Sequence, residues 1–205
     1  MRREVYKRPP GKTLYLPVRR RETAPEIEPE ALPAPLVVDK ATECHVTPPD
    51  VAARMVDYLG PCGDIRTLEP SAGTGNLVDA LLKAGQSRFE VVAIERHCDL
   101  WAAMRARFAY QVDGFNRCFL DYAVEARGKI TFPRVVMNPP FRKARVHIDA
   151  ALSLMGCNGH DAAPVLVACV PSTFEHSRAE FLESLEPDTF AAARVSAKLI
   201  RIEGD

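Results

Sequence analysis

The sequence predicts an α/β fold: a mostly parallel sheet with helices on both faces. Short apolar runs typical of buried strands alternate with segments of helical periodicity between residues 46 and 202, and that alternation favours a parallel sheet. Polar or acidic residues directly follow several of these runs. Because the carboxyl ends of parallel strands meet at one edge, we expect a ligand site there.

The first expected element is a helix that follows Thr47-Pro48. Val51, Met55 and Leu59 stand at helical spacing, and Gly60-Pro61 ends the segment. Next, residues 65–69 are predicted to be a short strand and residues 76–82 a helix, with the turn Pro-Ser-Ala-Gly-Thr-Gly between them.

This strand, turn and helix arrangement predicts a ligand cradle. Backbone N–H groups approach a ligand closely at such a turn, and Gly73 and Gly75 remove the β-carbons that would block the approach. Ser71 lies in the same turn, and Glu69 at the strand tip offers a carboxylate suited to an ammonium group. The dinucleotide fingerprint and the phosphate loop are both excluded, because the third glycine and the Gly-Lys-Ser/Thr ending are missing.

A second strand is expected over residues 89–94. Glu95 follows it, about 20 residues after the glycine turn, where a carboxylate can accept from both hydroxyls of a ribose. A helix over residues 99–108 comes next, and the segment 118–122 is predicted to be a third, short strand that ends in Asp121.

The apolar run 135–137 ends abruptly in Asn138, Pro139, Pro140 and Phe141. Two prolines cannot continue a buried strand, so the chain must turn there. The Asn138 side-chain oxygen and the Pro139 carbonyl can accept two hydrogen bonds from one NH2 group, and Phe141 can stack on the attached ring. The turn therefore suits a planar group that carries an amine.

Five further elements complete the predicted fold. They are a helix over 145–155, a strand over 164–170, a helix that Ser177 caps and that ends at Leu185, and two closing strands over 189–195 and 198–202.

Four of these motifs resemble those of the amino-group methyltransferases that use S-adenosylmethionine. Asn-Pro-Pro-Phe at 138–141 resembles their signature, and Glu-Pro-Ser-Ala-Gly-Thr-Gly at 69–75 resembles their cofactor motif, with Glu where many members have Asp. The segment that contains Asp121 resembles the motif whose acid accepts from the cofactor's adenine amino group. Thr47-Pro48 resembles the N-terminal motif of the Thr-Pro type of adenine methyltransferase, although His45 stands where an aromatic residue is usual.

The resemblance implies a Rossmann-like class I methyltransferase sheet whose final hairpin makes the last pair antiparallel. It implies S-adenosylmethionine as cofactor, bound by Thr47, Glu69, Ser71, Gly73, Gly75, Glu95, Asp121 and Asn138. It also implies that the catalytic turn consists of Asn138, Pro139, Pro140 and Phe141. For Thr47 two roles stay open: a hydrogen bond to the methionine carboxylate, or a cap on the helix that follows.

Adenine N6 in DNA is the acceptor that the motif order and Phe141 favour, since glutamine-directed relatives commonly have Tyr there. A base inside a duplex cannot reach such a site, so the adenine must be flipped out or single-stranded. The alternatives are an RNA adenine methyltransferase, a protein glutamine N5 methyltransferase, or a cofactor-binding subunit without activity. The elements after Phe141 leave no room for a target-recognition domain, so we expect lax specificity or a partner that supplies it.

The composition of residues 1–38 differs from that of the rest of the chain. Residues 1–38 are rich in proline, basic up to residue 21 and acidic after it, which predicts a disordered arm before a catalytic domain over 39–205. The net charge is zero, so basic character is only local: in the arm, and at Arg142, Lys143 and Arg145, which are placed to meet phosphates.

Other classes of protein find no support in the sequence. No apolar run approaches the ~18 residues of a membrane span, and no signal-peptide core is visible, so we expect a cytoplasmic protein without membrane contact. The six cysteines form no Cys-x-x-Cys pair, and we therefore expect no metal site.

Overall fold

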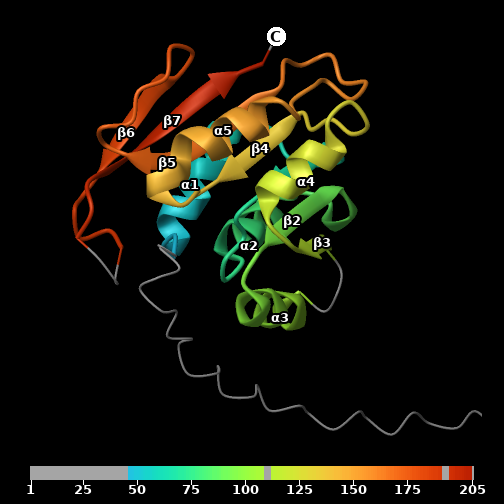
Figure 1. Cartoon of the computed structure of the whole chain (residues 1–205), viewed down its shortest axis with the longest axis horizontal. Helices are drawn as coiled ribbons and strands as arrows, with labels where there is room; N and C mark the ends of the chain where they lie inside the picture. The colour runs from blue at the N-terminus through green and yellow to red at the C-terminus, as the bar shows by residue number, and fades with distance from the viewer. Residues whose placement is uncertain (1–45, 109–111, 191–193, 205) are drawn as a thin grey trace, which may run out of the picture. The chain divides into compact units, whose positions relative to one another are not determined.

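The computed structural model describes residues 46–108, 112–190 and 194–204, and these residues form a seven-stranded sheet with helices on both faces (Figure 1). The strand order is β3-β2-β1-β4-β5-β7-β6. The elements in chain order are α1 (Pro49–Leu59), β1 (Thr67–Glu69), α2 (Asn76–Lys83), the 3-10 turn η2 (Arg88–Glu90), β2 (Val91–Glu95), α3 (Cys98–Arg107), β3 (Asp113–Asn116), α4 (Phe119–Ala126), β4 (Arg134–Met137), the 3-10 turn η3 (Phe141–Lys143), α5 (Ala144–Leu152), β5 (Val165–Pro171), β6 (Glu180–Leu185) and β7 (Ala197–Glu203).

The strand directions match the class I methyltransferase sheet. The five strands from β3 to β5 in the sheet order are parallel, whereas β7 runs antiparallel to both β5 and β6. The strand order reverses beside β1, because β2 pairs with one edge of it and β4 with the other. At such a switch point the connections on the two sides diverge and leave a crevice at the carboxyl ends of the strands.

Two layers of helices cover the sheet. One apolar core contains buried residues of α1, α2 and α3, and the other contains those of α4 and α5; Figure 1 shows α4 and α5 in front of the sheet and α1 and α2 behind it. Along β4, Val136 belongs to the first core, whereas Val135 and Met137 belong to the second. This alternation follows from the two-residue period of a strand, and it explains why the run is apolar throughout.

Most of the predicted elements are confirmed, with ends shifted by a few residues. The predicted strands 65–69, 89–94, 135–137, 164–170 and 198–202 correspond to β1, β2, β4, β5 and β7. The predicted helices after Thr47 and over 76–82, 99–108 and 145–155 correspond to α1, α2, α3 and α5.

The prediction of a strand over 118–122 is wrong, because Cys118 is the N-cap of helix α4 and the residues after it are helical. Buried residues of α4 recur at the helical spacing i, i+3, i+4 and i+7: Phe119, Tyr122, Ala123 and Ala126. Asp121 therefore lies in the first turn of a helix, and it is exposed. The true third strand is β3, an edge strand whose short, polar sequence Asp-Gly-Phe-Asn gives little strand signal.

The predicted helix from Ser177 to Leu185 is also wrong. Residues 180–185 form strand β6, which pairs antiparallel with β7 and has an irregularity between Phe181 and Glu183. Of the predicted strand 189–195, residues 191–193 lie outside the described part, and the remaining residues belong to no strand. The helical spacing of residues 177–185 is a local signal, whereas pairing with β7 is a tertiary interaction. The tertiary interaction determines the structure of this segment.

The arm predicted over residues 1–38, and His45, lie outside the described residues. Within the described part of the chain, no helix has the length and apolar character that crossing a membrane requires.

Candidate active site

A pocket of about 350 Å³ lies at the switch point of the sheet, within the size range of small-molecule sites. Its walls come from the ends of several strands and the segments that follow them. They include residues 70–74 after β1, 95–97 at the end of β2, 117–120 at the start of α4, and Asn138 after β4.

Glu95 is held in place by the glycine turn. The Gly73 N–H donates to Glu95 Oε2 at 2.8 Å, and the His97 N–H donates to Oε1 at 2.6 Å. Gly73 has a φ of +52°, a conformation that other residues rarely adopt. Because each carboxylate oxygen accepts more than one hydrogen bond, Glu95 remains able to accept from hydroxyl groups of a ligand in the pocket.

Glu69 lies beneath the turn rather than in the pocket wall. It is fully buried, and its Oε1 accepts from the Ser71 N–H at 2.8 Å. The pKa of Glu69 is raised to about 8, because burial and the negative charge of Glu95 outweigh the opposing backbone hydrogen bond from Ser71. Glu69 is therefore largely protonated at neutral pH. In the structure it supports the turn, by accepting the hydrogen bond from the Ser71 N–H.

Gly75 likewise does not line the pocket. It precedes α2 with a φ of +84°, and a β-carbon there would lie 2.6 Å from Phe108 Cε2 and 3.0 Å from Met104 Cγ. The start of α2 thus packs against side chains of α3 and of the residue after it. The second glycine of the turn is required for this packing and for the left-handed backbone.

Asn138 is anchored by a residue 91 positions earlier. Its Nδ2 donates to Thr47 Oγ1 at 3.0 Å. The Thr47 carbonyl accepts from Asn76 Nδ2 at 2.8 Å, and Asn76 Oδ1 accepts from Arg107 Nη1 at 2.8 Å. Thr47 makes no cap: Pro48 occupies the N-cap of α1, which has no side-chain cap bond. Of the two roles left open, the cap is therefore wrong, and the hydroxyl instead fixes the orientation of the Asn138 amide.

The rest of the Asn-Pro-Pro-Phe turn divides between pocket and core. Pro140 lines the pocket, whereas Pro139 is buried outside it. Phe141 is partly buried against the core on the α1 side of the sheet, where its ring meets Phe190 edge-on at 6.1 Å and 87°.

The structure thus brings together six of the eleven predicted site residues: Thr47, Ser71, Gly73, Glu95, Asn138 and Pro140. The five that do not line this pocket are Glu69, Gly75, Asp121, Pro139 and Phe141.

Sequence reasoning missed two rings in the pocket wall. Phe119 and His147 both line it, and their ring centroids are 5.8 Å apart. Burial, together with the positive charges of Lys143 and Arg96, lowers the pKa of His147 to about 4. The helical spacing of α4 would have revealed Phe119, whereas nothing in the sequence separates His147 from an ordinary core histidine.

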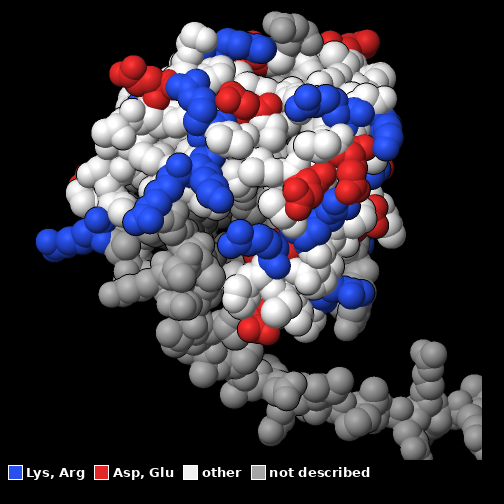
Figure 2. All heavy atoms as spheres, viewed as in Figure 1, with Lys and Arg blue, Asp and Glu red and all other residues white. Residues whose placement is uncertain are grey.

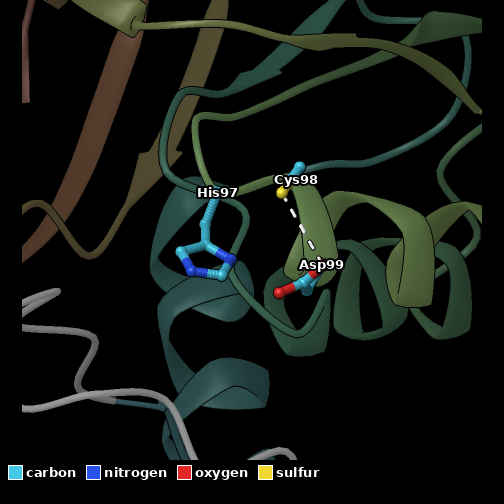
Figure 3. A group of neighbouring side chains, drawn as sticks. All are labelled: His97, Cys98 and Asp99. Carbon is cyan, nitrogen blue, oxygen red and sulfur yellow. Dashed lines mark hydrogen bonds between the residues drawn. The ribbon is translucent and has the colours of Figure 1, made fainter.

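Three consecutive residues beside the pocket, His97, Cys98 and Asp99, have potential metal-ligand atoms within 4.8 Å of one another (Figure 3). Cys98 and Asp99 are exposed, and the Cys98 thiol contacts Asp99 Oδ1 at 3.6 Å. Only His97 of the three lines the pocket. The absence of a metal site stays a prediction.

No protein-family model and no curated protein matches the chain. Solved structures similar in fold include the 23S rRNA methyltransferase ErmE, with a TM-score of 0.61, 17% identity, and coverage of 76% of this chain and 68% of that one. The modification subunit assigned to a type I restriction enzyme of Vibrio vulnificus YJ016 has a TM-score of 0.64 and 13% identity, over 78% of this chain and 44% of that one.

An S-adenosylmethionine-dependent O-methyltransferase of Thermotoga maritima has a TM-score of 0.58 and 14% identity, with coverage of 80% of this chain and 68% of that one. At these identities the likeness shows the fold, and the described part of the chain has the fold of the class I methyltransferases.

Proposed function

We propose that this protein is an S-adenosylmethionine-dependent methyltransferase that acts on an exocyclic amino nitrogen, with adenine N6 in DNA as the acceptor. The observation that carries the proposal is the Asn138 amide, which Thr47 fixes in the same pocket as the glycine turn and Glu95. This shared pocket supports a reaction in which the methyl group of the cofactor and the acceptor nitrogen meet.

The pocket residues fit the cofactor. Glu95, pre-positioned by two backbone N–H groups, suits the two hydroxyls of a ribose. The turn with Ser71 and Gly73 offers close backbone approach for the methionine part. When bound, S-adenosylmethionine supplies an electrophilic methyl group on its sulfonium.

The contribution of the chain to the reaction is positioning. The Asn138 amide oxygen and the Pro139 carbonyl accept from the two hydrogens of the acceptor NH2, which turns its lone pair toward the methyl group. Both hydrogen bonds strengthen as positive charge develops on the nitrogen, so they favour the transition state over the ground state. The Phe141 ring packs against Phe190 outside the pocket lining, so the proposed positioning rests on Asn138 and the Pro139 carbonyl.

A cationic pocket rim favours a nucleic acid as the acceptor. Four basic residues line the pocket, Arg96, Arg117, Arg142 and Lys143, of which Arg117 is ion-paired with Glu125 at 2.8 Å, whereas Glu95 is the sole acid among its described lining residues. Figure 2 shows Lys and Arg side chains around a hollow in the middle of the visible face. Because the chain as a whole has no net charge, this local excess supports an attraction for phosphates.

The predicted cation Arg145 does not belong to this rim. Its guanidinium donates to the Glu175 carbonyl and lies 5.1 Å over the Phe174 ring. Arg145 therefore joins α5 to the segment after β5, and the proposed phosphate contacts fall to the rim residues, with Arg142 and Lys143 nearest Asn138 in sequence.

The acceptor choice rests on site chemistry, because the structurally similar proteins include an rRNA methyltransferase, an O-methyltransferase and the modification subunit assigned to a restriction enzyme. An asparagine followed by a proline carbonyl gives two acceptors, which match an NH2 group better than a hydroxyl. Specificity is lax or supplied by a partner. Single-stranded or mismatched DNA reacts at least as fast as duplex, since unstacking then costs less.

Side-by-side methyl transfer to unmethylated DNA, to RNA and to a protein extract, followed by digestion and mass spectrometry, tests the proposal. We expect N6-methyladenine in the DNA digest. If N6-methyladenine is found only in the RNA digest, the acceptor is RNA and not DNA. If N5-methylglutamine is the only product, the proposal of a nucleic-acid acceptor is overturned. A protein that binds S-adenosylmethionine yet methylates none of the three would be a cofactor-binding subunit.

A further inference from the structure

His147 is a pocket residue to which the proposed reaction assigns no role. Its side chain is more than nine-tenths buried, yet it lines the pocket from the first turn of α5. Its Nδ1 is buried and has no hydrogen-bond partner among the described residues. Such an unpartnered polar atom is unfavourable, and a hydrogen bond between a ligand and the imidazole would offset it.

The position of His147 indicates which part of a ligand it meets. In the sheet order, Asn138 follows β4 and Glu95 ends β2, with β1 between them. If the ribose of the cofactor binds Glu95 and its methyl group points toward Asn138, the adenine base extends in the opposite direction, past β2. It then meets the segment 117–120. The ring centroids of Phe119, in this segment, and His147 are 5.8 Å apart. His147 therefore lies at the end of the pocket where we expect the base.

The chemistry of a neutral imidazole suits an adenine edge. Burial and the positive charges of Lys143 and Arg96 keep the ring uncharged at neutral pH. It therefore keeps one nitrogen lone pair as an acceptor beside one N–H donor. The 6-amino group of adenine is a donor, and it needs such an acceptor. Asp121, to which the sequence assigned this task, is exposed on α4 and does not line the pocket.

We propose that His147 accepts a hydrogen bond from the 6-amino group of the cofactor's adenine and so selects an adenine cofactor over other purines. This inference rests on the proposed function, because it requires S-adenosylmethionine in the pocket. It assigns base recognition to α5, which begins directly after the acceptor turn, instead of to a carboxylate on α4. His147 is thus a cofactor-binding residue with no part in the transfer itself.

Calorimetry with two ligands tests the proposal on the full chain: S-adenosylhomocysteine, and its analogue in which unsubstituted purine replaces adenine. The wild type should bind the adenine ligand about tenfold more tightly, the ratio for one hydrogen bond of about 1.4 kcal/mol. In His147→Phe this preference should vanish, because the adenine ligand falls to the level of the purine ligand while purine affinity stays within twofold. Equal weakening of both ligands would mean a structural role and overturn the proposal.

His97→Phe is the matched control, since His97 is the other histidine of the pocket lining and its Nδ1 also has no hydrogen-bond partner within the described part of the chain. His97 is only half-buried, and we expect its variant to keep the preference. Loss of preference in His97→Phe but not in His147→Phe would move the contact to His97. A wild type that binds neither ligand would refute the proposed function itself, not merely this inference.

A measurement on the unmodified protein covers the case in which His147→Phe fails to fold. The imidazole nitrogen resonances of ¹⁵N-histidine-labelled protein should shift for His147 when S-adenosylhomocysteine is added, and shift less with the purine ligand. His147→Gln, which keeps an acceptor, identifies the resonance and should retain part of the preference. Equal shifts with both ligands would contradict a contact with the 6-amino group.

Discussion

Replacing Thr47 by valine separates the orientation of Asn138 from the binding of the cofactor. The Thr47 hydroxyl accepts from Asn138 Nδ2 at 3.0 Å, and Thr47 itself is buried, with 6% of its surface exposed. Valine has almost the same shape but no acceptor. The substitution therefore removes the anchor of the amide and leaves the backbone contact from Asn76 in place.

The expected magnitude follows from the loss of one hydrogen bond to a part-buried amide. A donor left without its partner costs about 1–3 kcal/mol. If the anchored orientation is the one that meets the acceptor amine, the same energy appears in the barrier and lowers kcat roughly 5- to 150-fold. Affinity for S-adenosylhomocysteine should change less than about twofold, a range that corresponds to about 0.4 kcal/mol.

Single-turnover kinetics and calorimetry on the same preparation give both quantities. Thr47→Ser should restore kcat, because serine keeps the hydroxyl. Thr67→Val is the matched control: it removes another buried hydroxyl, which donates to the Ile65 carbonyl at 2.9 Å away from the pocket lining. If Thr47→Val instead lost cofactor affinity at unchanged kcat, Thr47 would bind the methionine carboxylate and our account of Asn138 would fail.

Three other substitutions test the turn. Glu95→Ala should weaken S-adenosylhomocysteine binding by roughly 1–3 kcal/mol in calorimetry, through lost charge-assisted hydrogen bonds, and unchanged affinity would remove Glu95 from the site. Gly75→Ala should lower the free energy of unfolding by about 1–3 kcal/mol, and by more than Gly85→Ala, since both have positive φ but only Gly75 would meet Phe108; equal losses would rule out the packing role. Glu69→Gln should become more stable than the wild type as pH rises from about 5 to 8, because the folded state holds the Glu69 proton up to about pH 8 and the unfolded state releases it near 4.5; parallel melting curves across this range would contradict a buried, protonated Glu69.

The strands and the glycine turn could be predicted because their signals are local. An apolar run that stops at Asn138, or a glycine turn between a strand and a helix, needs no knowledge of the rest of the chain. The same holds for Glu95, whose distance from the turn is set by one strand-helix-strand unit. These features explain why the fold class and the position of the pocket follow from the sequence.

The errors arose where tertiary contacts compete with local pattern. The segment at Phe119 is short and apolar, which suits a strand as well as a helix; the helical spacing appears only when the pattern is followed on through Tyr122 to Ala126. Strand β6 exists because β7 lies beside it. The anchoring of Asn138 by Thr47 joins residues 91 positions apart, and no local pattern contains such a contact.

The most direct measurement is the turnover of Asn138→Ala on unmethylated DNA at saturating S-adenosylmethionine, with N6-methyladenine counted in the nucleoside digest. Our account predicts a fall of about 10²–10³-fold, the range for removal of one preorganised transition-state hydrogen bond. It also predicts an affinity for S-adenosylhomocysteine within about twofold of the wild type, because Asn138 is proposed to hold the acceptor amine. A folded Asn138→Ala protein that methylates adenine at the wild-type rate, or that loses its cofactor affinity, would contradict the account.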